Sequence, residues 1–315
     1  MDTIGARQPR FDPRKPFSRA EARAAGITLD VLLGPRFHKI CWDSYVSRQV
    51  PITPQIRSIA ALRLAPPGSH ISHQTAAELW GAVVPGGPTT HLTTPSANGR
   101  LVRRGIKSHY YETYRPATTH LKGLPVSTPE QTFLDLASSG MALVDLVVMA
   151  DCLLKAKHTT TEGLIQAADG WAGRGRRLAR RAAGLARSGV DSPMETRIRL
   201  LIVLAGLPEP RVNLIVRGPN GEWKRRYDLA YEGLQLIVEY DGRQHAEDEG
   251  QWLTDIFRRE ELDQLHWRLI VVTSRGIYRD PLQTLERVRD AALIERGTVG
   301  VRRRFKPEWR LHFPS

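Results

Sequence analysis

Asp-Leu-Ala-Tyr-Glu-Gly-Leu-Gln-Leu-Ile-Val-Glu-Tyr-Asp-Gly-Arg-Gln-His, residues 228–245, is the stretch that decides the fold of the C-terminal part of this chain. Glu239 and Asp241 stand at the end of an apolar run that is typical of a buried strand, and Asp228 ends the strand before it. Carboxylates near a core are costly unless they are paired or bind a metal ion. The pattern therefore predicts carboxylates that converge on one face of a sheet, an arrangement suited to Mg²⁺.

The spacing within this stretch predicts how the acids are placed. Residues 232–233 suit a tight turn between two strands. With that turn, Asp228 lies opposite Ile237, and Glu239 lies two residues further along on the same face. Diagonal neighbours of this kind are roughly 7–8 Å apart, which lets two carboxylates reach one cation. Asp241 continues on that face.

The segments around this stretch predict an α-β-β-β-α-β-α order. Asp191-Ser-Pro-Met-Glu195 combines a cap, a proline in the first turn and an acid near the positive end of a helix, so a helix is expected from there to about Ala205. The remaining elements expected are strands at 211–217, 222–230, 234–240 and 268–273, and helices at 248–265 and 281–296. This order predicts a mixed four-stranded sheet flanked by helices.

The N-terminal half predicts smaller elements. Ser18 and Glu21 form a capping box for a helix at 19–25. A second helix is expected at 28–33, and strands within 37–46. This is a small winged-helix pattern, with an α+β subdomain that makes no DNA contact as the open alternative. Beyond it we expect helices at 54–65, 72–80, 128–136 and 143–156, and strands at 89–94 and 105–112.

We therefore predict a multi-domain α+β protein, because 315 residues exceed one ordinary domain. The expected ranges are a disordered leader at 1–15, a winged-helix-like region at 16–50, an α/β region at 51–157, an Arg-rich helical connector at 158–190, a C-terminal α/β domain at 191–297 and a basic tail at 298–315.

Charge separates the chain into two parts. The net charge is +13, of which residues 1–190 carry +12 and residues 191–315 carry +1. Such a basic part attracts polyanions, and nucleic acid is the expected one; a generally basic protein is the alternative. No apolar run approaches the ~20 residues of a membrane span. Cys41 and Cys152 have no disulfide or metal spacing and fit a reducing cytoplasm.

Residues 191–290 resemble the PD-(D/E)XK nuclease fold, and most closely the very-short-patch-repair (Vsr-like) endonucleases and the bacterial domains related to them. The resemblance is carried by Ser192-Pro-Met-Glu195, Asp228, Glu239-Tyr-Asp-Gly242, His245, Trp252, Asp255 and Arg258-Arg259. It implies a restriction-endonuclease-like α/β domain, with a mixed central sheet flanked by helices, that uses Mg²⁺ or Mn²⁺.

The resemblance also implies a role for each residue. Asp228 matches the central metal-binding acid, Glu239 the acid of the (D/E)XK element, and Glu195 the helix acid that completes the site. His245 and Asp255 resemble an acid–base pair.

Several of these residues have a structural alternative. For the group Asp228, Glu239 and Asp241, the alternative is neutralisation by Arg225 and Arg226, which equally suit phosphate contacts. Glu195 suits a helix N-terminus, His245 a loop, and Asp255 an i,i+4 pair with Arg259.

The chain departs from that family at one position. Asp241 occupies the lysine position of the (D/E)XK element, and no lysine stands near it in the sequence. Activation of the nucleophile would then fall to the metal site, to His245 or to Arg243. The metal ligands implied are Asp228, Glu239 and Asp241. Zinc ligation of the kind found in the repair enzymes is absent, because this part of the chain has no cysteine.

The N-terminal half, roughly 17–157, resembles the AbiEi-type type IV antitoxin regulators. The matching words are Phe17-Ser-Arg-Ala-Glu-Ala-Arg-Ala-Ala-Gly26, Ile71-Ser-His-Gln-Thr-Ala-Ala77, Gly123-Leu-Pro-Val-Ser-Thr-Pro129 and Leu134-Asp135-Leu136. The resemblance implies a winged helix on DNA, with Arg19, Arg23 and Arg36 as candidate contacts to its backbone.

These observations predict a cytoplasmic, metal-dependent DNA endonuclease with an N-terminal DNA-binding region. Further arginines expected to contact nucleic acid are Arg174, Arg176, Arg177, Arg180, Arg181, Arg225, Arg226, Arg243, Arg258 and Arg259. The alternative from another class is a non-catalytic, antitoxin-like regulator with a degenerate nuclease domain, which the missing lysine favours. RNA in place of DNA, a homodimer and a toxin partner stay open.

Overall fold

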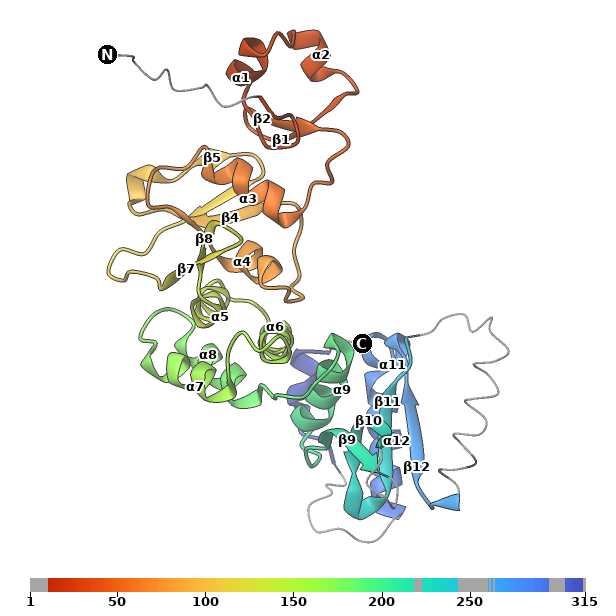
Figure 1. Cartoon of the computed structure of the whole chain (residues 1–315). Coiled ribbons are helices and arrows are strands. Elements are labelled where there is room, and N and C mark those ends of the chain that lie inside the picture. Colours follow the sequence, from red (N-terminus) through yellow and green to blue (C-terminus); the bar gives the residue numbers. More distant parts are fainter. Residues whose placement is uncertain are drawn as a thin grey trace. The chain divides into compact units, whose positions relative to one another are not determined.

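The computed structural model describes residues 11–217, 223–242, 260, 262, 264–294 and 304–313. The chain divides into two compact units, Met1–Leu136 (unit 1) and Ala137–Ser315 (unit 2) (Figure 1). Helices accompany three sheets of two, four and six strands among the described residues. The predicted multi-domain α+β class is confirmed.

Unit 1 begins with two short helices and a hairpin: α1 (Arg19–Ala24), α2 (Leu29–Leu33), β1 (Phe37–Cys41) and β2 (Ser44–Ser47). The expected capping box is present, because Ser18 accepts from the Glu21 N–H and the Glu21 carboxylate accepts from the Ser18 N–H. Asp43 turns the hairpin with a φ of 44°, and its carboxylate accepts from the Arg19 N–H. Short polar residues tolerate this left-handed conformation, so the hairpin closes without a glycine.

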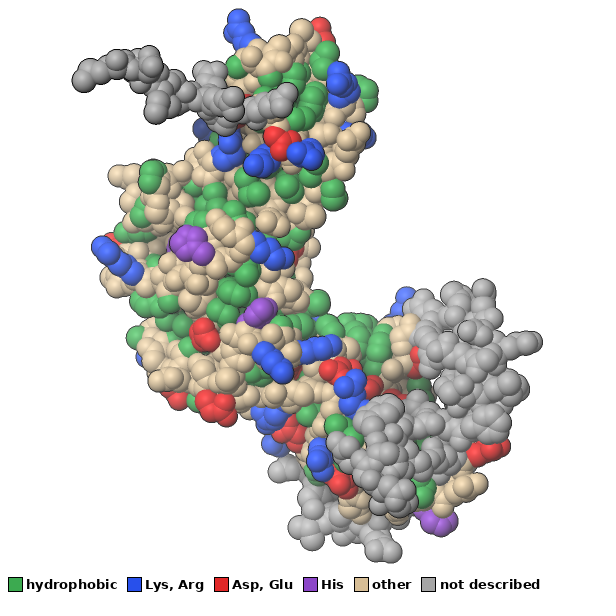
Figure 2. Space-filling view, viewed as in Figure 1, with side chains coloured by type: hydrophobic (Ala, Val, Ile, Leu, Met, Phe, Trp, Pro, Cys, Tyr) green, Lys and Arg blue, Asp and Glu red, His purple; other side chains and the backbone are tan. Residues whose placement is uncertain are grey.

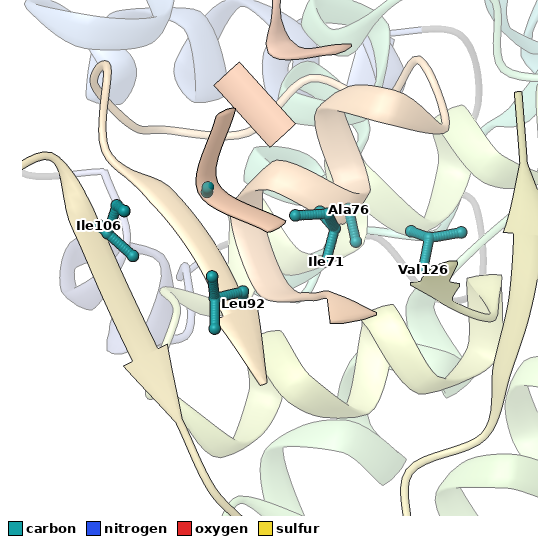
Figure 3. Close-up of a cluster of buried hydrophobic side chains, with 6 residues drawn as sticks. Ile71, Ala76, Leu92, Ile106 and Val126 are labelled. Atoms are coloured by element: carbon teal, nitrogen blue, oxygen red, sulfur yellow. The ribbon is translucent and has the colours of Figure 1, made fainter. Parts of the chain in front are cut away.

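The rest of unit 1 is a six-stranded sheet in the order β5-β6-β4-β3-β8-β7. Its strands are β3 (His70–Ile71), β4 (Thr90–Thr93), β5 (Val102–Arg103), β6 (Ile106–His109), β7 (Thr118–Leu121) and β8 (Leu124–Ser127), and its helices are α3 (Pro54–Leu62) and α4 (His73–Leu79). Figure 3 shows the core between them, where Ile71, Leu92, Ile106 and Val126 from four strands gather with Ala76 of α4. Burying each branched side chain stabilises the fold by roughly 1.5–3 kcal/mol.

Helix α5 (Pro129–Ser138) contains the boundary between the units, and α6 (Leu143–Lys155) belongs to unit 2. The expected range 51–157 therefore extends beyond unit 1. The expected Arg-rich connector forms two helices, α7 (Thr161–Gly170) and α8 (Arg176–Leu185). In α8 the alanines at 179, 182 and 183 are buried and the arginines face solvent. This segment is thus an amphipathic layer of unit 2.

The C-terminal part of unit 2 has the expected mixed four-stranded sheet. Its elements are α9 (Pro193–Leu204), β9 (Arg211–Arg217), β10 (Trp223–Tyr231), β11 (Leu236–Tyr240), β12 (Arg268–Val272), α11 (Ser274–Tyr278) and α12 (Pro281–Ile294). The strand order is β12-β11-β10-β9, with β9, β10 and β11 antiparallel and β12 parallel to β11. Helices α9 and α12 both contact β11 and each other (Figure 1). This topology places Asp228 and Glu239 on the two central strands, β10 and β11.

The register of β10 against β11 differs from the prediction by two residues. A 3-10 turn at Glu232–Leu234, followed by Gln235 with a φ of 48°, replaces the expected tight turn. Leu229 consequently pairs with Val238, so Asp228 stands level with Glu239, not with Ile237. The prediction of one shared face is unaffected, because side chains alternate with a period of two.

The remaining expectations concern the chain ends and one helix. Most of the helix expected at 248–265 and most of the leader expected at 1–15 lie outside the described residues. Within the expected tail, a 3-10 turn at Pro307–Leu311 buries Trp309, and the Lys306 N–H donates to the Ala205 carbonyl. None of the helices described is long and apolar enough to cross a membrane.

Candidate active site

Glu195 lies in the first turn of α9 and is almost fully buried. Ser192 caps the helix by accepting from the Glu195 N–H at 3.2 Å, and the Glu195 carboxylate accepts from the Asp191 N–H at 2.9 Å. Burial raises the pKa of Glu195 and the neighbouring charge of Asp228 raises it further, while the Asp191 N–H opposes both. The helix acid therefore has a capping role and also lies within electrostatic reach of the acid on β10.

Asp228 joins the two central strands through its side chain. Its Oδ2 accepts from the Tyr240 N–H at 3.0 Å. The backbone pairing of β10 and β11 is described as far as Leu229 and Val238, one position before Asp228. The carboxylate thus continues the hydrogen bonding at the end of the ladder. This contact fixes the position of the Asp228 side chain beside the last residues of β11.

Glu239 and Asp241 lie at that same end of β11. Glu239 is 9% exposed and stands beside Val271 of the parallel strand β12. Asp241 follows the strand, is partly exposed, and donates its N–H to the Val272 carbonyl at 2.9 Å. The strand pairing and the period of two place both acids on the face that carries Asp228.

Two cations, one on β10 and one on α6, contact Asp191, the residue whose N–H donates to Glu195. Arg226, on the same face of β10 as Asp228, forms an ion pair with the Asp191 carboxylate. Lys155, at the end of α6, places its Nζ 2.6 Å from the Asp191 carbonyl oxygen and 3.7 Å from Oδ1. Since the Asp191 N–H donates to Glu195, both cations lie one residue away from the helix acid. Sequence analysis missed Lys155, because it is far from Asp191 in the sequence and no local pattern links the two residues.

The residues present fit Mg²⁺ in their donor chemistry. Glu195 and Asp228 supply hard oxygen donors whose charges act on each other, and Glu239 adds a buried carboxylate on the same face. Within the described ranges, no group of three His, Cys, Asp or Glu side chains converges as a preformed cage. Mg²⁺ commonly uses one or two protein carboxylates and completes its shell with water and substrate phosphate. A site of two carboxylates is therefore sufficient.

Several predicted site residues lie outside the described residues. These are His245 and Asp255, the expected acid–base pair, and Arg243, Arg258 and Arg259. Arg225 is on β10, and its side chain is also outside the description. Their roles stay predictions.

The arginines of the predicted connector divide into two groups. Arg180 pairs with Asp169, with Nε and Oδ1 3.4 Å apart, and Arg181 pairs with Glu308. The exposed Arg174, Arg176 and Arg177 have no acidic partner in the part of the chain that the structure describes. Acidic side chains also stand among the Lys and Arg side chains of the face seen in Figure 2. The second group is thus the better candidate for phosphate contacts.

The structure brings together two of the three arginines expected to contact DNA in the N-terminal region. Arg19 and Arg23, one helical turn apart on α1, line a hollow of about 470 Å³ with residues of α2. The Arg19 Nε donates to the Tyr45 hydroxyl at 3.0 Å, which fixes its direction. Arg36 lines a different hollow, of about 510 Å³, beside Arg48.

A buried polar cluster in unit 1 was also missed. His73 has a φ of 53°, and its Nδ1 lies 3.8 Å from Asp135 Oδ2. The segments 71–77 and 134–136, which are distant in the sequence, are therefore close in space. The ring of His73 stacks on that of His109 with centroids 3.5 Å apart. Burial lowers the pKa of His73 to about 3 and that of His91 to about 4, so both rings are neutral near pH 7. Stacked, neutral rings of this kind form a polar core.

Comparison with known proteins identifies no function. No protein-family model matches the chain. Two curated relatives, "Uncharacterized protein Rv2248" and "Uncharacterized protein MT2308" from two strains of Mycobacterium tuberculosis, are each 29% identical over 119 residues. The similar stretch covers 36% of this chain and 43% of each relative, so the chain spans less than half of their length.

Proposed function

We propose that the protein is a metal-dependent endonuclease that hydrolyses phosphodiester bonds in DNA in the cytoplasm, with unit 2 as its catalytic part. The observation that carries the proposal is the electrostatic contact of the buried Glu195 on α9 with Asp228 on β10, with Glu239 on the same face of the neighbouring strand β11. Buried carboxylates are costly unless they are hydrogen-bonded, paired or bound to a cation, and a bound cation would offset the repulsion between Glu195 and Asp228.

The side chains would divide the work as follows. Asp228 and Glu239 would hold Mg²⁺ or Mn²⁺, and Glu195 would complete the site directly or through water. When bound, the ion supplies charge that polarises the scissile phosphate and favours attack by water. Arg226, which is half-exposed beside Asp228, is placed to neutralise a phosphate oxygen.

Lys155 supports the proposal in a second way. The (D/E)XK element of this chain has Asp241 where a lysine is usual, and Lys155 reaches the site from α6. Its Nζ contacts Asp191, so it acts on Glu195 through that residue. In this arrangement Lys155 is a positioning residue that keeps the Asp191 backbone directed at the Glu195 carboxylate.

A non-catalytic regulator is the second candidate, and a specific observation favours it. Arg19 and Arg23 share one face of α1 next to a closed hairpin, as a DNA-binding module requires. On this proposal the N-terminal module would bind DNA and the acids of unit 2 would remain from a nuclease ancestor.

Cleavage of supercoiled plasmid tests the proposal. Wild type, Asp228→Asn and Asp290→Asn are each incubated with Mg²⁺, Mn²⁺ or EDTA, and nicked and linear products are measured. Asn at 228 retains an oxygen that accepts from the Tyr240 N–H, so the strand contact survives while the charge is lost. We expect a loss of about 10²-fold or more in rate for Asp228→Asn. The exposed Asp290, paired with Arg289, is the matched control and should cleave normally.

The outcomes separate the two candidates. Metal-dependent cleavage that Asp228→Asn leaves unchanged would show that the activity resides elsewhere and would overturn the proposal. Absence of cleavage under every condition, with a gel shift that persists in EDTA, would support the regulator. For that regulator, Arg23→Ala should weaken the gel shift, whereas Asp228→Asn should not.

A further inference from the structure

Unit 1 contains a cavity that the proposed nuclease does not use. Its volume is about 620 Å³, within the range of small-molecule sites. One wall comes from β3 and β4, and the other from the loop at 110–116 between β6 and β7, whose sequence is Tyr-Tyr-Glu-Thr-Tyr-Arg-Pro. The cavity lies entirely in unit 1.

His70 provides a buried polar group in the lining of this cavity, which also includes Glu112, Thr113 and Thr118. The residue is 7% exposed and lines the cavity, and its Nε2 is buried without a hydrogen-bond partner among the described residues. A buried nitrogen left unbonded costs free energy. The nitrogen is covered by protein, so the ring must turn toward the cavity before a ligand can bond to it and remove this cost. Burial lowers the pKa of His70, so the ring is uncharged near neutral pH and suits an uncharged partner.

The tyrosines of the loop form rigid walls. The Tyr111 hydroxyl donates to Asp135 Oδ1 at 2.8 Å, and the Tyr114 hydroxyl donates to Gln131 Oε1 at 2.7 Å. Asp135 is in turn held by Ser127 and by the Gln131 amide. Since both hydroxyl protons are already used, these side chains present ring surface to the cavity more than free donors.

The tyrosine rings of the loop favour a planar ligand. The Thr94 hydroxyl is also engaged, donating to the Ser96 carbonyl at 2.9 Å. Glu112 and Thr113 also line the cavity, and both are exposed polar residues of the loop. A planar heteroaromatic ring needs flat apolar walls and one or two polar contacts at its edge. At the rim, the exposed Arg115 is placed to bind a phosphate attached to such a ring.

We propose that this cavity binds a nucleobase, with the His70 Nε2 hydrogen-bonded to the edge of the base and the tyrosine loop against its face. The base belongs to a free nucleoside or nucleotide, or to single-stranded DNA whose unstacked base enters the cavity. The proposal does not depend on the nuclease, and the Asp228→Asn variant should bind the base normally.

Calorimetric titration of the full chain tests the proposal. The probes are adenosine, guanosine, cytidine, thymidine and the monophosphates of these nucleosides, the 15-mers of dA and dT, and glucose as the sugar. His70→Phe keeps a ring on β3 and removes the nitrogen, and we expect it to weaken binding of the preferred base at least tenfold. His120→Phe, the same change at an exposed histidine of β7, is the matched control and should leave binding unchanged.

Tyr114→Ala keeps the test decisive if His70→Phe alters the fold. Tyr114 is 38% exposed, so its truncation removes ring surface at the rim and should weaken the same probe at least threefold. Binding of nucleosides identifies a free ligand, and binding of oligonucleotides alone identifies single-stranded DNA. Either result supports the proposal only if both His70→Phe and Tyr114→Ala weaken that binding. Binding of glucose without any base, or base binding that neither variant changes, overturns it.

Discussion

At the scale of single residues, Glu195 caps a helix, which favours its charged form, and is buried near Asp228, which disfavours it. As a capping acid it is stabilised by the Asp191 N–H, and as a buried acid near Asp228 it resists ionisation. The second effect is larger, because the pKa is raised overall. The residue thus stores unfavourable charge at the place where the proposed cation would bind.

Glu195→Gln should change stability in a pH-dependent way. Because the pKa of Glu195 is raised in the folded protein, its favourable contribution is complete below its ordinary pKa and is lost as the pH rises through the raised value. The Gln variant cannot ionise, so its stability relative to wild type should increase over that interval. Urea unfolding from pH 4 to 8 without metal measures this, with exposed Glu162→Gln in the first turn of α7 as control. A constant difference between wild type and Glu195→Gln would contradict the assignment.

Arg199 is fully buried in α9 and its removal should be costly. Its guanidinium pairs with Asp151 Oδ2 at 3.1 Å and Glu209 Oε1 at 2.9 Å, and donates to the Leu185 carbonyl at 2.8 Å. Arg199→Ala would remove the cationic partner of the buried Asp151 and leave it only its hydrogen bonds from the Arg187 N–H and the Thr196 hydroxyl, with an expected loss of about 3–5 kcal/mol.

Chemical denaturation at pH 7 measures the effect of Arg199→Ala. Arg187 pairs with the same Glu209 at the surface, at 2.8 Å, and is the matched control. Arg187→Ala should cost no more than about 1 kcal/mol, because exposed ion pairs contribute little. Equal losses for the two variants would show that burial is not what makes the Arg199 pair important.

At the scale of elements, α8 presents arginines whose ionic surroundings differ. Arg176 and Arg177 have no acidic partner in the described ranges, whereas Arg180 is paired with Asp169. A free arginine can release a counterion from DNA, but a paired one must first give up its partner.

Substitution within α8 should therefore give unequal effects on DNA binding. Arg176→Ala with Arg177→Ala should lower the slope of log K against log salt by about two, and Arg180→Ala should lower it by less than one. Fluorescence anisotropy of a labelled duplex from 50 to 300 mM salt measures both slopes. If Arg180→Ala has the larger effect, the Asp169 pair does not restrain it in solution, and this account of α8 is wrong.

At the scale of the whole molecule, the two units carry different proposed ligands. Each has its own buried core, and multi-domain chains commonly unfold in more than one step. A ligand that binds only the folded state raises the stability of the unit that binds it, by about 2.7 kcal/mol at one hundred times its Kd.

Scanning calorimetry should thus show one transition that responds to Mg²⁺ and another that does not. The responsive transition belongs to unit 2, and Asp228→Asn should abolish its shift while leaving the midpoint without metal nearly unchanged. His70→Phe, in unit 1, is the control and should retain the Mg²⁺ shift. A shift that survives in Asp228→Asn would place the cation elsewhere.

The sequence by itself determined the features that depend on local rules. The start of α9 followed from the cap, proline and acid at 192–195, and the strands of unit 2 followed from their apolar runs. The shared face of Asp228 and Glu239 also followed, even though the register was wrong by two, because a shift by an even number preserves the face. The 3-10 turn and the positive φ of Gln235 were missed. Many residue types are compatible with such a turn, so no residue in this segment predicts it.

Only the tertiary structure decided the contacts between residues that are distant in the chain. Lys155 reaches Asp191, His73 meets Asp135, and Arg181 pairs with Glu308, although nothing in the sequence near each residue indicates its partner. The cavity at His70 depends on such contacts as well, because the tyrosine loop is held by the hydrogen bonds to Asp135 and Gln131 on α5. Periodicity and capping act over a few residues, whereas burial and charge pairing depend on which segments pack together, and that is fixed only when the whole unit folds.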